Sequence, residues 1–283
     1  MPLEAYQRKI FIDKLENLEF LDSSESSITF LEDENIEFED QSNIRFANNN
    51  ELIFNKKNFG KFIITKKFIK FRTYDDFNQD VFLSTALNQP IACYEYLKKN
   101  IVLHCSAFEY KGKSNILLGL PKSGKSTLLG VGLDKVKFVT EDIGIIRNKQ
   151  LLPSIPLIKL QNENIGEEYF EDFCPIPFDE RKRIVCRLKT KYFSKSPKPI
   201  NKIFFIERCN QKNIKNIEPK AKLAKLFSSS FRPSEFSNVN DEKDFFSNIS
   251  QLLEVDIKEF NIPQQEKPIM SFSRLLNYIN SSN

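Results

Sequence analysis

Short apolar runs separated by polar clusters fill the first part of the chain. The clusters include residues 22–27 and 48–50. Short strands with polar turns at this spacing are typical of an antiparallel sheet, so the pattern predicts a small β-rich subdomain over residues 1–79. The expected strands are Lys9–Ile12, Ile28–Leu31, Ile36–Phe38, Ile44–Phe46, Leu52–Phe54, Phe62–Ile64 and Phe68–Arg72.

Helical spacing replaces this pattern between residues 80 and 100. Apolar side chains such as Leu87 and Ile91 recur there at intervals that line one side of a helix. Pro90 lies within the stretch and would break or restart a helix. We expect one or two helices, which open a larger domain over residues 80–283.

Two apolar runs then flank a short turn. Residues 101–110 and 114–118 are separated by Lys111-Gly112-Lys113, and a short connection with a glycine favours an antiparallel hairpin. Symmetric pairing about this turn would put His104 across from Gly119.

A phosphate-binding pattern follows the hairpin. Residues 119–126 read Gly-Leu-Pro-Lys-Ser-Gly-Lys-Ser, which fits glycine, four residues and Gly-Lys-Ser/Thr, between an apolar run and a helix-like segment. A strand that stops at such a turn and restarts as a helix aims several backbone N–H groups at one point, which suits an anion. The pattern therefore predicts a P-loop. Its expected nucleotide contacts are Gly119, Pro121, Lys122, Ser123, Gly124, Lys125, Ser126 and Thr127.

The hairpin register places His104, the only histidine, at the mouth of this loop. Two interpretations stay open. One is a half-buried strand histidine hydrogen-bonded to backbone, and the other is a functional group beside bound phosphates. A slip of one residue in the register would turn the side chain to the other face of the sheet.

Two adjacent carboxylates follow the next apolar run. A strand over residues 136–139 is expected to end in Thr140-Glu141-Asp142, as a Walker B-like element does. Magnesium needs hard oxygen ligands such as a carboxylate and the loop hydroxyl of Ser126, and an acceptor hydroxyl needs a base. Glu141 and Asp142 could divide these tasks between them. A solvated acidic turn is the alternative.

The rest of the chain reads as further strands and then helices. Lys182 and Arg183 belong to a dense charge cluster, which is usually a solvated face, but guanidinium and ammonium groups near a nucleotide can also stabilise transferring phosphate. The expected strands are residues 143–147, 151–155, 157–160, 184–188 and a central buried one at 202–207; the expected helices are residues 125–132, 164–173, 219–227, 241–253 and 271–279, with a loop at 174–177.

Composition excludes several classes of function. The five cysteines are scattered and there is one histidine, which argues against a zinc site. A net charge of +4 with interspersed signs gives no support for nucleic-acid binding. No apolar run approaches the roughly 20 residues that span a bilayer, and the N-terminus lacks the apolar core of a secretory signal. We therefore expect a soluble cytoplasmic protein with no membrane partner.

The segment from His104 to Ile146 resembles the catalytic core of the HPr kinase/phosphorylase family and its shorter relatives. The features that carry the resemblance are Leu103-His104-Cys105-Ser106, the loop 117–127, and the apolar strand that ends in Val139-Thr140-Glu141-Asp142. The family usually presents two aspartates where this chain has Glu141-Asp142. Outside this core the match is weak, and no signature for reverse phosphorolysis is present.

The resemblance implies a mixed, partly antiparallel α/β (α+β) core akin to phosphoenolpyruvate carboxykinase. It also implies a phosphotransferase that uses ATP and Mg²⁺ to phosphorylate a serine-type hydroxyl of a peptide, protein or small metabolite. Carried over by position, the catalytic residues are His104, Lys125, Glu141 and Asp142, and the magnesium ligands are Ser126, Glu141 and Asp142. Which carboxylate is the base, and the oligomeric state, a homo-oligomer included, stay open. The alternatives are an ATPase or nucleotide switch that binds a partner without phosphorylating it, and a module that holds nucleotide without turnover.

Overall fold

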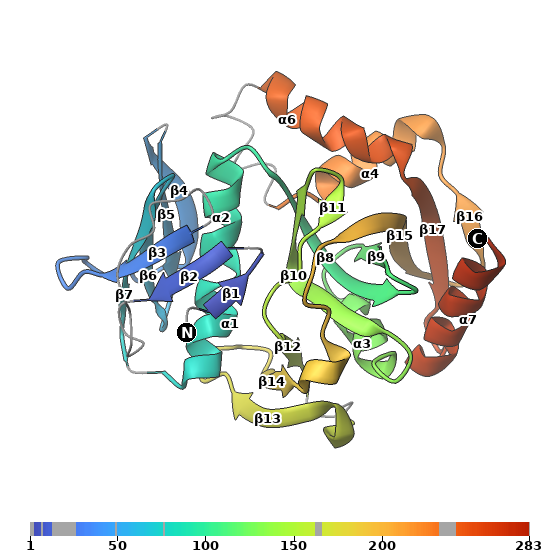
Figure 1. Cartoon of the computed structure of the whole chain (residues 1–283), viewed down its shortest axis with the longest axis horizontal. Coiled ribbons are helices and arrows are strands. Elements are labelled where there is room, and N and C mark those ends of the chain that lie inside the picture. Colours follow the sequence, from blue (N-terminus) through green and yellow to red (C-terminus); the bar gives the residue numbers. More distant parts are fainter. Residues whose placement is uncertain are drawn as a thin grey trace.

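The computed structural model describes residues 3–6, 8–12, 27–48, 50–75, 77–161, 166–231 and 242–282 of the 283-residue chain. These residues form a mixed α/β fold with three β-sheets. In Figure 1 the first sheet lies at the left, the second at the right, and the small third sheet lies below, between the two. None of the helices in these ranges is long and apolar enough to cross a membrane.

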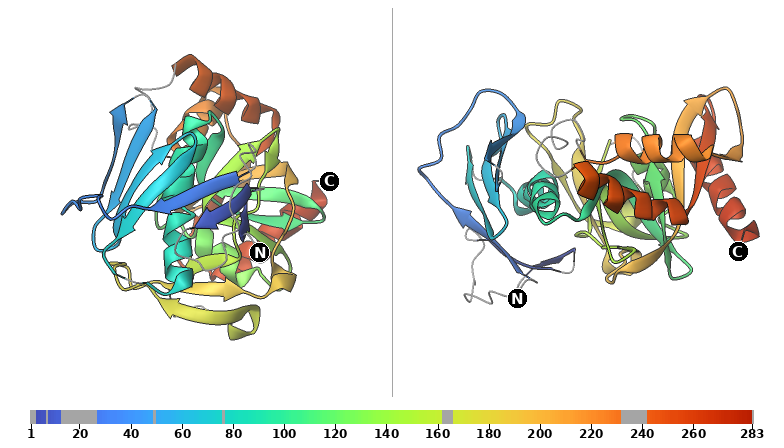
Figure 2. Two further views of the ribbon diagram at one scale, coloured as in Figure 1. Left: turned by 60° about the vertical axis from the view of Figure 1, so that its left-hand side comes forward. Right: turned by 90° about the horizontal axis from the view of Figure 1, so that it is seen from above.

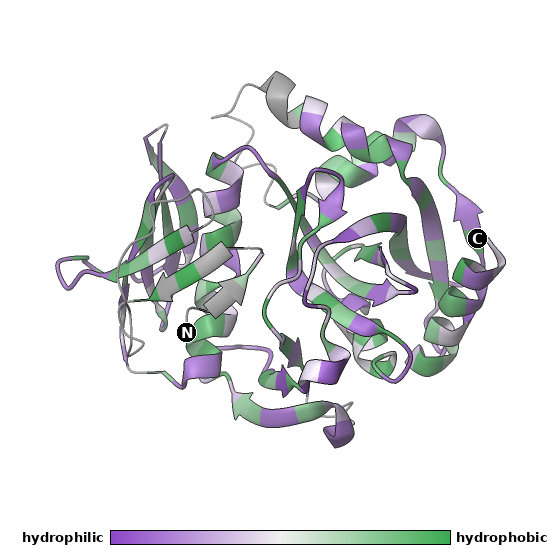
Figure 3. Ribbon diagram, in the orientation of Figure 1, coloured by the Kyte–Doolittle hydropathy of each residue, from purple (hydrophilic) through white to green (hydrophobic). Residues whose placement is uncertain are grey.

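The first sheet has seven strands in the order β1-β2-β3-β7-β6-β5-β4. Hydrophobic and hydrophilic residues alternate along its strands, so that one face is apolar (Figure 3). Its strands are β1 (Leu3–Ala5), β2 (Arg8–Ile12), β3 (Ser27–Glu32), β4 (Asn43–Asn48), β5 (Glu51–Lys56), β6 (Gly60–Thr65) and β7 (Phe68–Thr73).

The sequence correctly predicts six of these strands, but two details are wrong. Residues 36–38 form no strand, and the sheet is mixed, because β3 pairs in parallel with both β2 and β7. Strand β7 follows β3 only after the whole β4-β5-β6 meander. Residues 22–26, part of the polar cluster before β3, lie outside the described residues.

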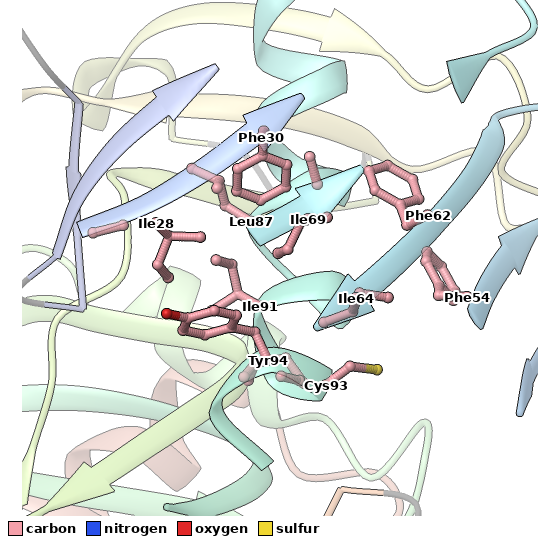
Figure 4. Close-up of a cluster of buried hydrophobic side chains, with 14 of the residues drawn as sticks. Ile28, Phe30, Phe54, Phe62, Ile64, Ile69, Leu87, Ile91, Cys93 and Tyr94 are labelled. Carbon is pink, nitrogen blue, oxygen red and sulfur yellow. The ribbon is translucent and has the colours of Figure 1, made fainter. Parts of the chain in front are cut away.

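Two helices cover the apolar face of the first sheet: α1 (Gln79–Ala86) and α2 (Gln89–Leu97). The sequence predicts one or two helices here; two form, and Pro90 occupies the first turn of α2. Figure 4 shows Ile91 and Tyr94 of α2 beside Phe30 of β3 in one buried cluster. Seen from above, the helices lie between the first sheet and the rest of the protein (Figure 2).

The second sheet has the order β11-β10-β8-β9-β15-β17-β16, and β11 also pairs with β15. Its strands are β8 (Ile101–Tyr110), β9 (Lys113–Leu118), β10 (Lys137–Arg147), β11 (Gln150–Leu151), β15 (Lys198–Cys209), β16 (Ile214–Asn216) and β17 (Asp256–Pro263). The predicted hairpin is β8-β9, whose turn residues Lys111 and Gly112 have φ of 51° and 78°. Strand β15 is central and pairs in parallel with β9 and β17.

Helices cover both faces of this sheet. Helices α3 (Lys125–Val131) and α7 (Pro268–Ser281) bury apolar residues with Phe204 of β15 on one face. On the other face α4 (Pro219–Ser228) and α6 (Glu242–Ser250) pack with Phe205, its neighbour on the same strand. Successive residues of β15 face opposite sides of the sheet, and both sides are covered by helices. The strand is therefore apolar at every position of 203–206, as the sequence analysis expects of a buried central strand.

Several predicted boundaries are wrong. Strand β10 does not end at the carboxylates: it continues to Arg147, and Asp142 has φ of 65° within it. The β10-β11 hairpin about Asn148-Lys149 forms, but β11 stops at Leu151. The sequence misses β16 and β17, since neither carries a long apolar run.

The third sheet, in the order β12-β14-β13, lies below the second. Its strands are β12 (Leu157–Leu160), β13 (Phe170–Pro175) and β14 (Ile184–Leu188). The helix predicted over residues 164–173 is wrong where it can be compared: Glu167–Tyr169 form one 3-10 turn and β13 follows. The remaining part, residues 164 and 165, lies outside the described residues.

Candidate active site

A glycine loop (residues 119–124) connects β9 to α3. Gly119 has φ of 146° and Gly124, the N-cap of α3, has φ of 98°, conformations that favour glycine. A Cβ at Gly119 would lie 2.7 Å from the carbonyl oxygen of Ile206 on β15. The loop therefore packs tightly against the neighbouring strand, and a side chain at either Gly119 or Gly124 would strain it.

Two polar groups in and after this loop lie inside the protein. The Lys125 Nζ donates to the Gly119 and Leu120 carbonyl oxygens at 2.8 and 3.1 Å, and burial lowers the pKa of Lys125. The buried Ser123 Oγ has no hydrogen-bond partner among the described residues. An unsatisfied hydroxyl in a loop with a buried ammonium is the arrangement that an anion would complete.

Glu141 faces the glycine loop. Ser126, in the first turn of α3, donates its hydroxyl proton to Glu141 Oε1 at 2.7 Å. The Glu141 side chain is buried, and this burial, with the nearby Asp142 charge adding to it, raises its pKa to about 7. A carboxylate that is this poorly solvated favours either a proton or a cation beside it.

Asp142 interacts with different groups. Its Oδ2 accepts hydrogen bonds from Lys159 Nζ on β12 at 2.6 Å and from Asn88 Nδ2, between α1 and α2, at 3.2 Å. Burial acts to raise the pKa of Asp142, but the charge and hydrogen bond of Lys159 outweigh it and bring the pKa well below its ordinary value. The two adjacent carboxylates thus have different environments: Asp142 is ionised and paired, whereas Glu141 is not paired.

His104 lies between the two parts of the site. The β8-β9 pairing ends at Ser106 and Leu117, and beyond it β8 pairs with Ser229 and Ser230, so the expected pairing of His104 with Gly119 does not form. His104 nevertheless lies near the loop, because it lines the same cavity as Gly119. Its side chain is hydrogen-bonded to the backbone of Asp142, and burial lowers its pKa, so that the imidazole is neutral near pH 7. The structure therefore confirms the backbone-bonded interpretation of His104, and a role beside bound phosphates stays a prediction.

A cavity of ≈ 920 Å³ opens over the glycine loop. Residues 119–123 and His104 form one side, and the segment 228–231 after α4 forms another, tied to β8 by the His104 N–H, which donates to the Ser229 carbonyl oxygen at 2.8 Å. Three cationic side chains, Arg181, Arg208 and Lys225, also line it. The cavity is large enough for a small-molecule ligand.

The structure brings most of the predicted site residues together. Pro121, Lys122 and Ser123 line the cavity, and Thr127 lies half-buried in the first turn of α3. Arg183 forms an ion pair with Asp179 at 2.6 Å, and its charge acts on Glu141 and Asp142. Lys182 does not line the cavity; its backbone forms a tight turn with φ of 52°.

The polar residues of the site that sequence reasoning missed include Asn88, Lys159, Arg181 and Arg208. Three of these had a local signal. Lys159 is the charged residue of the apolar run 157–160, Arg208 follows the apolar run of β15, and Arg181 belongs to the same charge cluster as Lys182 and Arg183. Asn88 has none, because only the packing of distant elements brings it to Asp142.

The oxygens of Ser126 and Glu141 fit a magnesium ion. Magnesium is bound in proteins by one or two carboxylates together with substrate phosphates, and a buried carboxylate beside a hydroxyl supplies that donor set. Across the described ranges no group of three or more His, Cys, Asp and Glu side chains could hold a metal on its own. Asp142 fits less well as a ligand, since Lys159 already occupies its carboxylate.

Comparisons with known proteins add little to this picture. No protein-family model and no curated protein matches the sequence. Among solved structures, the chain is similar to the HPr(Ser) kinase/phosphatase from Coxiella burnetii, with a TM-score of 0.34 and 10% identity over 64% of this chain and 97% of that one. A likeness this weak says nothing about the chemistry of the site.

Proposed function

We propose that this protein is an ATP- and Mg²⁺-dependent kinase that transfers a phosphoryl group to a serine-type hydroxyl of a peptide, protein or small metabolite. The observation that carries the proposal is the separation of the two carboxylates. Glu141 is joined to the first turn after the glycine loop through Ser126, whereas Asp142 is paired with Lys159 beside His104. Metal binding and proton transfer need carboxylates in different environments, and this site has them.

On the donor side, the glycine loop and Lys125 hold the phosphate chain. In the structure Lys125 is bound to two loop carbonyl oxygens, so its ammonium already lies in the loop's concavity. Ser126 and Glu141 would hold the magnesium ion, which supplies positive charge to the phosphate oxygens. The Glu141 carboxylate would then have the cation that its burial favours.

On the acceptor side, Asp142 orients the hydroxyl and takes its proton as the bond from the acceptor oxygen to the γ-phosphorus forms and the bond to the β-phosphate oxygen breaks. A weakly basic aspartate suffices, because the transition state is loose and the proton leaves late. Lys159 and Asn88 hold the Asp142 carboxylate in place. Neutral His104 contributes a hydrogen bond near the transferred group without adding charge.

The test is phosphoryl transfer itself. The protein is incubated with ATP, Mg²⁺ and a panel of serine peptides and hydroxyl metabolites, and new phosphoester is followed by mass spectrometry. Lys125→Ala and Asp142→Asn should each reduce transfer by about 100-fold or more. Firm ATP binding without phosphoester on any acceptor, together with phosphate release into water, would instead favour the ATPase alternative.

Lys149→Ala is a matched control for these variants. Lys149 lies in the β10-β11 turn and forms an exposed ion pair with Glu254, so its removal alters the charge but not the site. Its transfer rate should equal that of the wild type. A Lys125→Ala variant that keeps full transfer would contradict the proposed binding of phosphate.

A further inference from the structure

Arg208 lies at the end of the apolar run of β15, directly beside the glycine loop. Its Nε donates to the Ser123 carbonyl oxygen at 3.2 Å, and its Nη1 donates to the Pro263 carbonyl oxygen at 3.3 Å. Two edges of the guanidinium are thus held by backbone groups, one in the loop and one at the end of β17. The side chain is half-buried and lines the cavity above the loop.

The third nitrogen of this guanidinium points to the loop without a partner. Arg208 Nη2 lies 2.8 Å from the position that a Cβ at Gly124 would occupy, on the left-handed residue that begins α3. No hydrogen bond to Nη2 is formed by the described residues. Glycine at this position therefore gives the Nη2 group access to the turn from loop to helix.

Arg208 also lacks a counter-ion within the part of the chain that the structure describes. The adjacent carboxylate, Glu207, has Lys225 as its nearest cation, at 4.0 Å, and its side chain is half exposed. By contrast, Arg45 and Arg187 each have a carboxylate oxygen within hydrogen-bonding distance. A half-buried guanidinium with a free donor and no carboxylate is suited to a phosphate.

We propose that Arg208 binds the phosphate chain of the nucleotide through Nη2, as a second cation beside the glycine loop in addition to Lys125. This inference rests on the proposed function. Lys125 approaches the loop from α3, whereas Arg208 comes from β15, so the two charges hold the phosphates from different elements. Because its other nitrogens are bound to Ser123 and Pro263, little side-chain entropy is lost when Nη2 engages the ligand.

The experiment measures the affinity of the full-length protein for ATP, ADP and adenosine by isothermal titration calorimetry with Mg²⁺ present. Arg208→Gln should weaken ATP and ADP binding by about 10- to 100-fold and leave adenosine binding unchanged, since a charge-assisted hydrogen bond is lost. Arg208→Lys, which keeps the charge, should recover part of this loss. The control is Arg45→Gln on the first sheet, which should bind as the wild type does.

Melting curves without ligand distinguish a role of Arg208 in phosphate binding from a role in stabilising the glycine loop. If Arg208 only ties the loop to β17, Arg208→Gln lowers the Tm while ATP affinity, measured below the Tm, stays within about twofold; that result overturns the inference and leaves the kinase proposal standing. A wild type that binds no ATP overturns both. Equal weakening of ATP and adenosine would also count against a phosphate contact.

Discussion

Replacing Glu141 by glutamine tests the electrostatics of the site through stability, independently of any substrate. Glutamine has nearly the same shape and can still accept the hydrogen bond of Ser126, but it cannot ionise. The wild-type carboxyl has a pKa of about 7 in the folded protein, against an ordinary value of 4.5. The variant therefore removes the cost of ionising a buried carboxyl and changes little else.

The sign and the size of the effect follow from linkage. Because the folded pKa is the higher one, the unfolded chain releases its proton first, and the wild type loses stability as the pH rises from 4.5 to about 7. Each unit of pKa difference is worth about 1.4 kcal/mol. Between about pH 5 and about pH 8 the wild type should lose about 2–3 kcal/mol relative to Glu141→Gln.

The assay is urea unfolding of both proteins at these two pH values in EDTA, so that no metal offsets the charge. The quantity of interest is the change, with pH, of the difference in unfolding free energy between variant and wild type. Glu254→Gln, at an exposed ion pair, serves as the control and should show almost no pH-dependent difference.

Two results would refute this reasoning. One is that the difference in unfolding free energy between Glu141→Gln and the wild type stays the same at the lower and the higher pH. The other is a wild type that gains stability relative to the variant as the pH rises, because Glu141 would then be a well-paired ion. Either result would also remove the reason for a cation beside this carboxylate.

Three further outcomes are expected. Lys159→Met removes the charge that keeps the pKa of Asp142 low, so the acid limb of the pH–rate profile should move to higher pH. If the limb does not move, Asp142 is not the base that takes the proton. Gly119→Ala puts a Cβ 2.7 Å from a β15 carbonyl at φ of 146°, and calorimetry should show about 1–3 kcal/mol less stability and weaker ATP binding. Gly132→Ala puts a Cβ 2.2 Å from a buried ring of α7 and should lower the Tm without changing ATP affinity.

Much of the site could be predicted because its signals are local. The glycine loop, Lys125 and Ser126 lie within a few residues of one another, and the turn at Lys111-Gly112 forms the β8-β9 hairpin that leads into the loop. The failures are of another kind. The strand predicted to end at Glu141-Asp142 continues, because β10 pairs with β8 along most of its length, a contact between distant segments.

By itself, the sequence determined where the glycine loop begins and ends, which hairpin precedes it and that two carboxylates follow it. These are consequences of φ preferences and short-range pairing, which act within about ten residues. Only the tertiary structure decided which carboxylate faces the loop and which one pairs with Lys159, since the left-handed Asp142 and the packing of β12 set those directions. It also decided that Asn88 contacts Asp142 and that Arg208 contacts the glycine loop, because long-range packing and sheet pairing have no signature in any single stretch of sequence.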